Sequence, residues 1–275
     1  MKTILITGCS SGIGLESAKA LKERGYHVFA TARKLEDVAA LNNLGLESYQ
    51  LDVTNPKSCR SALDDILTKT NGKLFAIFNN AGYMQAGAIE DLSIDVIRAQ
   101  IETNFFGAVS MTQLVLPIMR KQGFGRIIQN SSILGIMTIP FYGAYNASKH
   151  ALEGFSLTLR QELRDTNIKV SLINPGPIYT NLRENAYQIY QDTLKNKSQS
   201  VYLKVYKAME ESYFKNRGHS SLTDTPKIVV KSLIHALENK HPRAHYYVGK
   251  PAKTMAVLKH LLPESIFEWV IKKIK

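Results

Sequence analysis

Residues 7–14 read TGCSSGIG, a glycine-rich turn between a short apolar run and a segment with helical spacing. A turn of this kind between a strand and a helix is typical of a dinucleotide-binding α/β fold. Gly8 permits the turn, Gly12 lets the backbone approach a pyrophosphate, and the helix N-terminus favours the negative charge. The spacing is G-x-x-x-G-x-G, which differs from the commoner G-x-G-x-x-G. A glycine turn without a ligand is the alternative interpretation.

The rest of the chain alternates short apolar runs with helical patterns. The strand candidates are residues 2–7, 27–32, 48–53, 74–80, 126–132, 169–176 and 244–249. Helical spacing covers residues 15–25, 58–70, 95–122, 147–166 and 226–240. Near-continuous apolar strands that alternate with helices indicate a parallel sheet covered on both faces. We expect one Rossmann-type α/β domain over residues 1–275, with a doubly wound sheet of about seven mainly parallel strands.

Composition narrows the class of protein. The chain has 275 residues, 44% of them hydrophobic, and a formal net charge of +12. It has no apolar run long enough for a membrane-spanning helix. Its basic residues do not cluster with aromatic ones in a nucleic-acid-binding module, so no nucleic-acid partner is expected. Cys9 and Cys59 fit a reducing compartment better than a disulfide framework, which favours a cytoplasmic location. Because Cys9 lies in the glycine turn, a redox role and a simple small-residue role both remain open.

The second strand candidate ends at Ala32, and Arg33 follows it. An NAD site wants an acidic residue at this position to accept from the ribose 2′-hydroxyl. Alanine cannot form that bond, whereas arginine can hold a 2′-phosphate through two hydrogen bonds. NADP is therefore the favoured cofactor, and NAD is the alternative. The other interpretation of Arg33 is a solvated surface charge.

Seven motifs occur in an order that resembles the short-chain dehydrogenase/reductase family. They are TGCSSGIG at 7–14, LDV at 51–53, NNAG at 79–82, NFFG at 104–107, NSS at 130–132, YNASK at 145–149 and NPGPIYT at 174–180. The resemblance covers roughly residues 1–250 and implies a nicotinamide-dependent oxidoreductase. Within the family, GCSSGIG together with ATAR resembles the branch of 17β-hydroxysteroid and retinol dehydrogenases. The chain is also similar to bacterial YbbO-like NADP-dependent aldehyde reductases.

The resemblance implies a catalytic set of Asn104, Ser132, Tyr145 and Lys149. In the family, the tyrosine matching Tyr145 is the general acid for carbonyl reduction and the base for alcohol oxidation. The serine matching Ser132 hydrogen-bonds the substrate oxygen, the lysine matching Lys149 holds the nicotinamide ribose, and the asparagine anchors a water in the proton relay. Tyr145 and Lys149 are four residues apart on a helix, so we expect the ammonium, together with the positive ring of oxidised nicotinamide, to lower the pKa of the tyrosine. Taken alone, a surface Tyr/Lys pair and a turn-forming serine remain alternatives.

The cofactor positions follow from the glycine turn, from Arg33 and from the resemblance. They are Gly8, Ser10, Ser11, Gly12, Ile13, Gly14, Arg33, Asp52, Val53, Asn80, Ala81, Gly82, Tyr145, Lys149, Pro175, Gly176, Ile178 and Thr180. Many NADP-preferring members carry a second basic residue just before the middle glycine, where this chain has Ser11. Phosphate selectivity then rests mainly on Arg33, assisted by Ser10, Ser11 or Lys34. No metal site is expected.

Residues 181–225 follow the last motif, where this family keeps its substrate-binding lid. The segment is rich in tyrosine and aliphatic side chains, so it can cover an apolar substrate. The expected substrate contacts are Ser132, Leu134, Tyr142 and Tyr145. Further apolar walls are expected from Met84, Ile133 and Phe141. An apolar aldehyde, ketone, steroid or retinoid is favoured over a sugar, and core packing of the same side chains is the alternative.

The basic excess is concentrated at the C-terminal end, where ten Lys and Arg against three Glu occur from residue 225 onward. In the extension at residues 251–275, five apolar side chains fall on one helical face: Ile266, Phe267, Val270, Ile271 and Ile274. Two interpretations remain for this amphipathic helix. It lies peripherally on a membrane, or it docks on its own domain or on a partner subunit. The resemblance implies a homodimer or a homotetramer.

Three functions remain open at this stage. The first is an NADP(H)-dependent reductase of apolar aldehydes or ketones, and the second is an NAD(P)-dependent hydroxysteroid or retinol dehydrogenase that works oxidatively. The third is a non-enzymatic nucleotide-sensing or scaffold protein on the same fold, because a fold does not dictate function. The complete set of Ser132, Tyr145 and Lys149 argues against the third.

Overall fold

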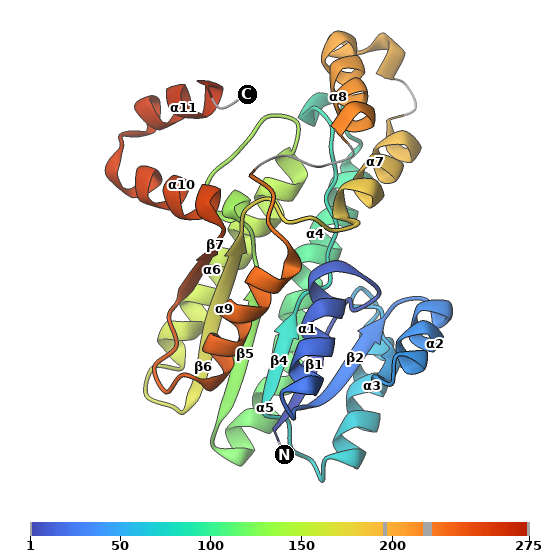
Figure 1. Cartoon of the computed structure of the whole chain (residues 1–275), viewed down its shortest axis with the longest axis vertical. Helices are drawn as coiled ribbons and strands as arrows, with labels where there is room; N and C mark the ends of the chain where they lie inside the picture. Colours follow the sequence, from blue (N-terminus) through green and yellow to red (C-terminus); the bar gives the residue numbers. More distant parts are fainter. Residues whose placement is uncertain (1, 195–196, 217–221, 274–275) are drawn as a thin grey trace.

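The computed structural model describes residues 2–194, 197–216 and 222–273 (Figure 1). Its sheet has seven strands in the order β3-β2-β1-β4-β5-β6-β7, and the pairings between neighbours are parallel. The strands are β1 (Thr3–Ile6), β2 (His27–Ala32), β3 (Glu47–Gln50), β4 (Ala76–Asn79), β5 (Gly125–Asn130), β6 (Ile168–Pro175) and β7 (His245–Val248). The expected doubly wound, Rossmann-type sheet is confirmed, and it is parallel throughout. The strand order reverses between β1 and β4, where such sheets bind ligands at the carboxyl ends of their strands.

Helices cover both faces of the sheet (Figure 1). One face carries α1 (Gly12–Glu23) and α9 (Pro226–Glu238), and the other carries α3 (Pro56–Lys69), α5 (Gly107–Gln122) and α6 (Gly143–Glu162). α2 (Leu35–Asn43) links β2 to β3. Successive side chains of a strand point to opposite faces, so Ile4 and Ile6 pack with α1 and α9 while Leu5 packs with the other three helices. The apolar runs that predicted the strands therefore build two cores at once.

The helical segment expected at residues 95–122 is divided by a change of pitch. α4 (Ile94–Ile101) continues through a π-helical turn at Glu102–Phe106 into α5. Single π turns inside α-helices are frequent at functional sites. This one carries Asn104, which is buried. The apolar periodicity predicted the helix but contains no signal for the turn.

β3 is shorter than the strand expected at residues 48–53. It ends at Gln50, and a turn follows in which Thr54 donates its N–H to Oδ1 of Asp52 at 2.9 Å. The side chain of Asp52 therefore stabilises a turn at this edge of the sheet instead of extending the strand.

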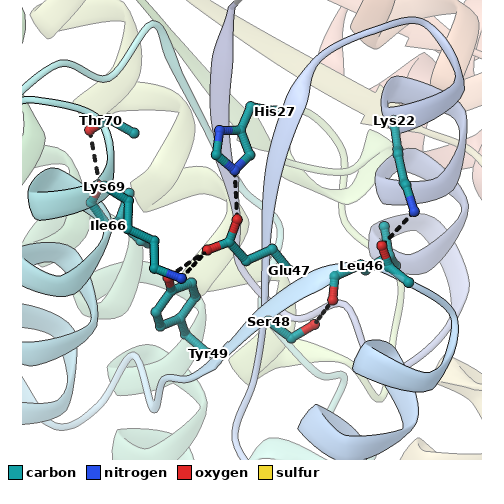
Figure 2. Close-up of polar contacts among 10 residues, drawn as sticks. Lys22, His27, Leu46, Glu47, Ser48, Tyr49, Ile66, Lys69 and Thr70 are labelled. Atoms are coloured by element: carbon teal, nitrogen blue, oxygen red, sulfur yellow. Dashed lines mark hydrogen bonds and ion pairs between the residues drawn. The ribbon is translucent and has the colours of Figure 1, made fainter.

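At the opposite end of β3, Glu47 joins three elements (Figure 2). Its carboxylate accepts a hydrogen bond from Lys69 of α3 at 2.6 Å and lies 2.6 Å from Nε2 of His27 on β2. Burial raises the pKa of Glu47, but hydrogen bonds from Lys69, His27 and Tyr49 outweigh burial and lower it to about 2. This cluster lies at the amino ends of the strands, far from the ligand-binding edge, so we assign it to stability.

The segment expected as a substrate lid, residues 181–225, is mostly helical. It forms α7 (Leu182–Thr193), the 3-10 turn η4 (Lys197–Gln199) and α8 (Leu203–Asn216), and Figure 1 shows both helices beyond α4. Residues 195–196 and 217–221 lie outside the described residues. Tyr190 and Tyr206 are buried in an apolar cluster with Ala88, Leu92 and Ala144. These tyrosines fasten the segment to the domain, and its role as a lid stays a prediction.

The chain ends in α10 (Lys250–Leu261) and α11 (Glu264–Lys273). Phe267 is buried against α10 and the loop after β5, and Ile271 packs at the border of the same cluster. Ile266 and Trp269 are exposed, and Ile274 lies outside the described residues. α11 thus docks on the domain through Phe267. Within the described residues, no helix combines the length and the apolar character needed to cross a bilayer, and contact with a membrane surface stays a prediction.

Candidate active site

The glycine turn joins the carboxyl end of β1 to the N-terminus of α1. Gly8 and Gly12 have φ angles of 71° and 58°, where a side chain is disfavoured. A Cβ on Gly14 would lie 2.2 Å from the carbonyl oxygen of Gly8 and 2.6 Å from Nδ2 of Asn80. Ser11 is the N-cap of α1, but its side chain makes no capping hydrogen bond, and the first turn has no acidic residue. The N-terminal N–H groups are not capped by this side chain, and the turn fits the pyrophosphate of a dinucleotide.

Asn80, which follows β4, braces this turn. Its Nδ2 donates to the carbonyl oxygens of Thr7 and Gly8, both at 2.9 Å. Oγ1 of Thr7 accepts the N–H groups of Asn80 and Ala81 at 2.9 and 3.0 Å. Oδ1 of Asn80 accepts from Nδ2 of Asn130, at the end of β5, at 2.9 Å. Hydrogen bonds therefore link the carboxyl ends of three neighbouring strands directly at the turn.

Arg33 lies just beyond β2 with an exposed side chain, and Ala32 before it is buried. Burial raises the pKa of Tyr83, and the charge of Arg33 opposes that rise, so the guanidinium stands near the loop that follows β4. Lys34 is paired with Glu36 at 3.1 Å. Arg33 has no acidic partner of this kind among the described residues, which leaves its guanidinium available to an anion.

Asp52 and Val53 lie on the loop after β3. Oδ1 of Asp52 accepts from the N–H and the hydroxyl of Thr54 at 2.9 and 2.8 Å. Val53 is buried beside Gly107, where a Cβ would come within 2.7 Å of its Cγ2. Both positions therefore have fixed side chains at the same edge of the sheet as the glycine turn.

The loop after β6 contains the last group of expected cofactor positions. Pro175 ends the strand, and Gly176 donates its N–H to the carbonyl oxygen of Val248 at 2.9 Å. Ile178 forms an isolated parallel bridge with Asp224. Thr180 lies against the glycine turn, because a Cβ on Gly12 would come within 3.0 Å of the threonine side chain. The fold thus brings this loop onto the turn at residues 7–14, as contact with one cofactor requires.

Ser132, Tyr145 and Lys149 come together between the end of β5 and the start of α6. Their exposed fractions are 8%, 7% and 5%, so a solvated surface pair no longer accounts for Tyr145 and Lys149. The side chain of Ser132 lies close enough to Tyr145 to lower the pKa of the phenol. Nζ of Lys149 lies 5.7 Å from the ring centre of Tyr145 and donates to the carbonyl oxygen of Asn130 at 2.7 Å. The three side chains form one buried group at the ligand-binding edge.

Burial dominates the electrostatics of this group. It raises the pKa of Tyr145 to about 12, and the side chain of Ser132 opposes the rise. It also lowers the pKa of Lys149 to about 8, while the charge of Glu153 opposes that fall. In the protein without cofactor, burial penalises the phenolate, and the lowering expected with oxidised nicotinamide bound stays a prediction. At neutral pH Tyr145 is therefore a phenol, which can donate a proton.

Asn104 braces the same group from the π turn. Its Nδ2 donates to the carbonyl oxygen of Tyr83 at 2.9 Å and to Oγ of Ser148 at 3.2 Å, and its Oδ1 accepts the N–H of Tyr83 at 3.0 Å. Oγ of Ser148 donates to the carbonyl oxygen of Tyr145 at 2.7 Å. Gly82 faces this side chain, since a Cβ there would come within 3.0 Å of Oδ1. A relay water at Asn104 stays a prediction.

The expected substrate contacts Leu134 and Tyr142 lie on the segments that directly follow Ser132 and precede Tyr145. Leu134 donates its N–H to Oγ of Ser132 at 3.1 Å, and its side chain packs at the border of the cluster that holds Phe267. Tyr142 is the N-cap residue of α6. Phe141 has a φ of 66°, which is unusual for an aromatic residue and typical of strained functional loops. Its ring meets that of Tyr202 edge-on at 5.3 Å, so the loop before Tyr145 packs against the segment at residues 181–225.

Two expected side chains serve packing. Ile133 is a buried member of the cluster with Met137 and Phe267. Cys9 is fully buried, its Sγ donates to the carbonyl oxygen of Ile6 at 3.3 Å, and burial raises its pKa to about 12. Such a thiol stays protonated and inert, which favours the small-residue interpretation of Cys9.

The sequence reasoning missed the polar residues that connect the site. Thr7 and Asn130 belong to quoted motifs but had no assigned role, although each is polar at the carboxyl end of a strand. Ser131 likewise belongs to a quoted motif without an assigned role, and Glu153, four residues after Lys149, was not identified. Their partners come from elements distant in the sequence, so only the fold reveals them.

Comparisons with known proteins agree with this geometry. The family model described as short chain dehydrogenase matches residues 2–191. The uncharacterized oxidoreductase YbbO of Escherichia coli K12 is 40% identical over 271 residues, which cover 98% of this chain and 94% of that protein. The 3-ketodihydrosphingosine reductase of Bacteroides thetaiotaomicron is 35% identical over 272 residues, covering 98% of this chain and 96% of that protein. The solved structure of a short chain dehydrogenase/reductase from Burkholderia phymatum in complex with NAD has a TM-score of 0.79 at 24% identity, over 96% of this chain and 94% of that one. The chain therefore belongs to the short-chain dehydrogenase family of oxidoreductases, related to YbbO and the retinol dehydrogenase branch.

Proposed function

We propose that the chain is an NADP(H)-dependent reductase of apolar aldehydes or ketones, with Tyr145 as its general acid. The observation that carries the proposal is the buried group of Ser132, Tyr145 and Lys149 at the strand edge that also holds the glycine turn. When bound, the nicotinamide cofactor supplies the hydride chemistry.

The residues of the site are proposed to position one oxygen and deliver one proton. Oγ of Ser132 already accepts the N–H of Leu134, so its hydroxyl hydrogen is free to point to a substrate oxygen. Tyr145 is a phenol at neutral pH because burial raises its pKa, and it hands its proton to that oxygen during reduction. Lys149 is held by the carbonyl oxygen of Asn130, and its ammonium favours the phenolate that results.

Selectivity for NADP is proposed to rest on Arg33. The strand end offers Ala32 where an NAD site has an acid, and the exposed guanidinium has no acidic partner among the described residues. The neighbouring Lys34 is already paired with Glu36, so it contributes less. If the protein uses NADH in preference to NADPH, this part of the proposal is wrong.

The substrate is proposed to be apolar. Leu134, two residues after Ser132, packs on the apolar cluster of Phe267, and Phe141 and Tyr202 pack on the apolar cluster that contains Ala144 at the start of α6. The relative from Bacteroides thetaiotaomicron is a reductase of a long-chain keto compound by its printed name, which supports a ketone with a hydrocarbon chain. Oxidation of an alcohol of the same kind is the alternative, because the cofactor ratio decides the direction.

The experiment is a substrate panel read by the absorbance of NADPH. Purified protein is given NADPH or NADH with aliphatic and aromatic aldehydes, long-chain ketones, steroids and a sugar aldehyde as the polar control. The proposal expects NADPH oxidation with an apolar carbonyl and little turnover of the sugar. Turnover of the sugar alone would overturn the substrate class, and absence of turnover with every carbonyl and alcohol would overturn the enzymatic role.

Two further properties are proposed. The cysteines Cys9 and Cys59 are free and buried, which fits a reducing, cytoplasmic compartment.

A homodimer or homotetramer is proposed from the family, and light scattering during size-exclusion chromatography tests it. A chain that elutes as a monomer at all concentrations would contradict the oligomer.

A further inference from the structure

A buried carboxylate lies eight residues beyond Tyr145 on α6. The exposed fraction of Glu153 is 6%. Its Oε1 accepts hydrogen bonds from Oγ of Ser131 and Nδ2 of Asn174, each at 2.5 Å, and its Oε2 lies 2.9 Å from Nε2 of His245. These partners come from the loop after β5, from β6 and from β7. A buried charge requires such partners, and here three separate elements provide them.

The partners of Glu153 also hold Ser132. Nδ2 of Asn174 donates to the carbonyl oxygen of Ser132 at 3.1 Å as well as to the carboxylate. Ser131, whose hydroxyl is bound to the carboxylate, is the residue directly before Ser132. A Cβ on Gly135 would lie 2.7 Å from Oγ of Ser131 and 3.0 Å from Cγ of Glu153. The turn that carries Ser132 is therefore packed closely onto this one side chain.

Glu153 also lies one helical turn from Lys149 on the same face of α6. Its negative charge raises the pKa of Lys149, against the larger lowering by burial. Tyr145 on the same helix is a further titratable group near Lys149. The titratable groups that face Glu153 from β7 are His245 and Tyr247.

We propose that Glu153 is a positioning residue of this active site, which fixes Ser132 through Ser131 and Asn174 and supports the charge of Lys149. The inference deepens the proposed function and rests on it. It assigns a task to a residue that is not expected to touch substrate or cofactor. Its two effects are separable, because one depends on the length of the side chain and the other on its charge.

Two substitutions separate these effects. Glu153→Gln keeps an acceptor oxygen but removes the charge, so the pKa of Lys149 falls further. A protonated lysine is present below its pKa and lost as pH rises through it, so the high-pH limb of the activity profile shifts to lower pH by about one unit. Glu153→Asp keeps the charge but withdraws the carboxylate by one methylene. In that variant kcat falls about 10- to 100-fold, as misplacement of a reacting group does, while the high-pH limb stays near its wild-type position.

The matched control is Glu162→Gln, an exposed glutamate near the end of the same helix, which leaves kcat and the pH profile unchanged. Wild-type kcat and pH profile in both Glu153 variants would overturn the inference while leaving the proposed function intact. A wild-type protein that turns over no carbonyl would instead overturn the proposed function. In that case cofactor fluorescence still measures how the affinity for the nicotinamide cofactor depends on pH. This measurement reports the pKa of Lys149 without any substrate.

A variant that fails to fold is replaced by Ser131→Ala, which removes a single hydrogen bond to the carboxylate and leaves its charge. The inference expects a lower kcat, an unchanged high-pH limb and little change in KM from this variant. The inference would be overturned if Ser131→Ala kept the wild-type kcat while Glu153→Gln left the pH profile of cofactor affinity unshifted. It would also be overturned if Ser131→Ala kept the wild-type kcat and Glu153→Gln failed to fold.

Discussion

Replacing Arg33 by alanine is the sharpest test of how the chain selects its cofactor. The side chain lies beyond β2, is exposed, and has no acidic partner among the described residues, so binding a 2′-phosphate breaks no ion pair. Hydrogen bonds to a charged group contribute about 1.5–3 kcal/mol. A central value of about 2 kcal/mol corresponds to about a 30-fold rise in the Kd of NADPH. NADH lacks the phosphate, so its Kd should stay near that of the wild type.

The assay is a fluorescence titration of each reduced cofactor at low and at moderate salt. The loss caused by Arg33→Ala should shrink as salt rises, because an exposed charge pair is screened. Lys34→Ala is the matched control, since Lys34 is adjacent but engaged by Glu36 at 3.1 Å, and its effect should be several times smaller. An equal loss for NADPH and NADH, or no loss for either, would refute the reasoning.

Two other substitutions test the cofactor turn and the stability cluster. Gly14→Ala should weaken NADPH binding by at least about tenfold, because its Cβ would lie 2.2 Å from the carbonyl oxygen of Gly8. In the control Gly154→Ala, the added Cβ meets nothing within 4 Å. Equal NADPH affinities of the two variants would contradict the steric argument. Glu47→Gln should lower the free energy of unfolding at neutral pH by about 1 kcal/mol, a value reduced for solvent screening. The pKa of Glu47 in the folded protein is lowered to about 2. Its contribution to stability is therefore present above the unfolded pKa of about 4.3 and is lost as pH falls toward 2. If urea unfolding shows the same difference in free energy between wild type and Glu47→Gln at all pH values, this cluster is not the cause.

The fold was predictable because its signals are local. The apolar runs around Ile4 and Ile128 mark strands buried on both faces, and the glycine turn marks the first crossover. The exact ends of the strands were less predictable. β3 ends early because Asp52 forms a turn with Thr54. The sequence alone does not show whether such a polar residue ends the strand or lies within it.

The catalytic set was predictable only through the order of the motifs. Tyr145 and Lys149 have a helical spacing that many surface pairs share, and the resemblance alone separated them from such pairs. Their burial could not be read from the sequence, so the rise in the pKa of Tyr145 in the protein without cofactor was not predicted. Physically, the pKa depends on what covers the phenol, and those atoms come from other elements.

The connecting network was outside the reach of any local pattern. Glu153 meets Asn174 on β6 and His245 on β7, partners 21 and 92 residues away. The π turn that presents Asn104 was not predicted either, because it is a single turn inside a continuous helical segment and no residue type marks it.

The central claim is that Tyr145 donates the proton in carbonyl reduction, and Tyr145→Phe tests it most directly. The substitution removes one oxygen atom from a buried ring and leaves the glycine turn untouched. The rate of NADPH oxidation with the best substrate of the panel should fall about 100- to 10,000-fold, while the Kd of NADPH stays close to that of the wild type. Turnover near the wild-type rate in Tyr145→Phe would contradict the account.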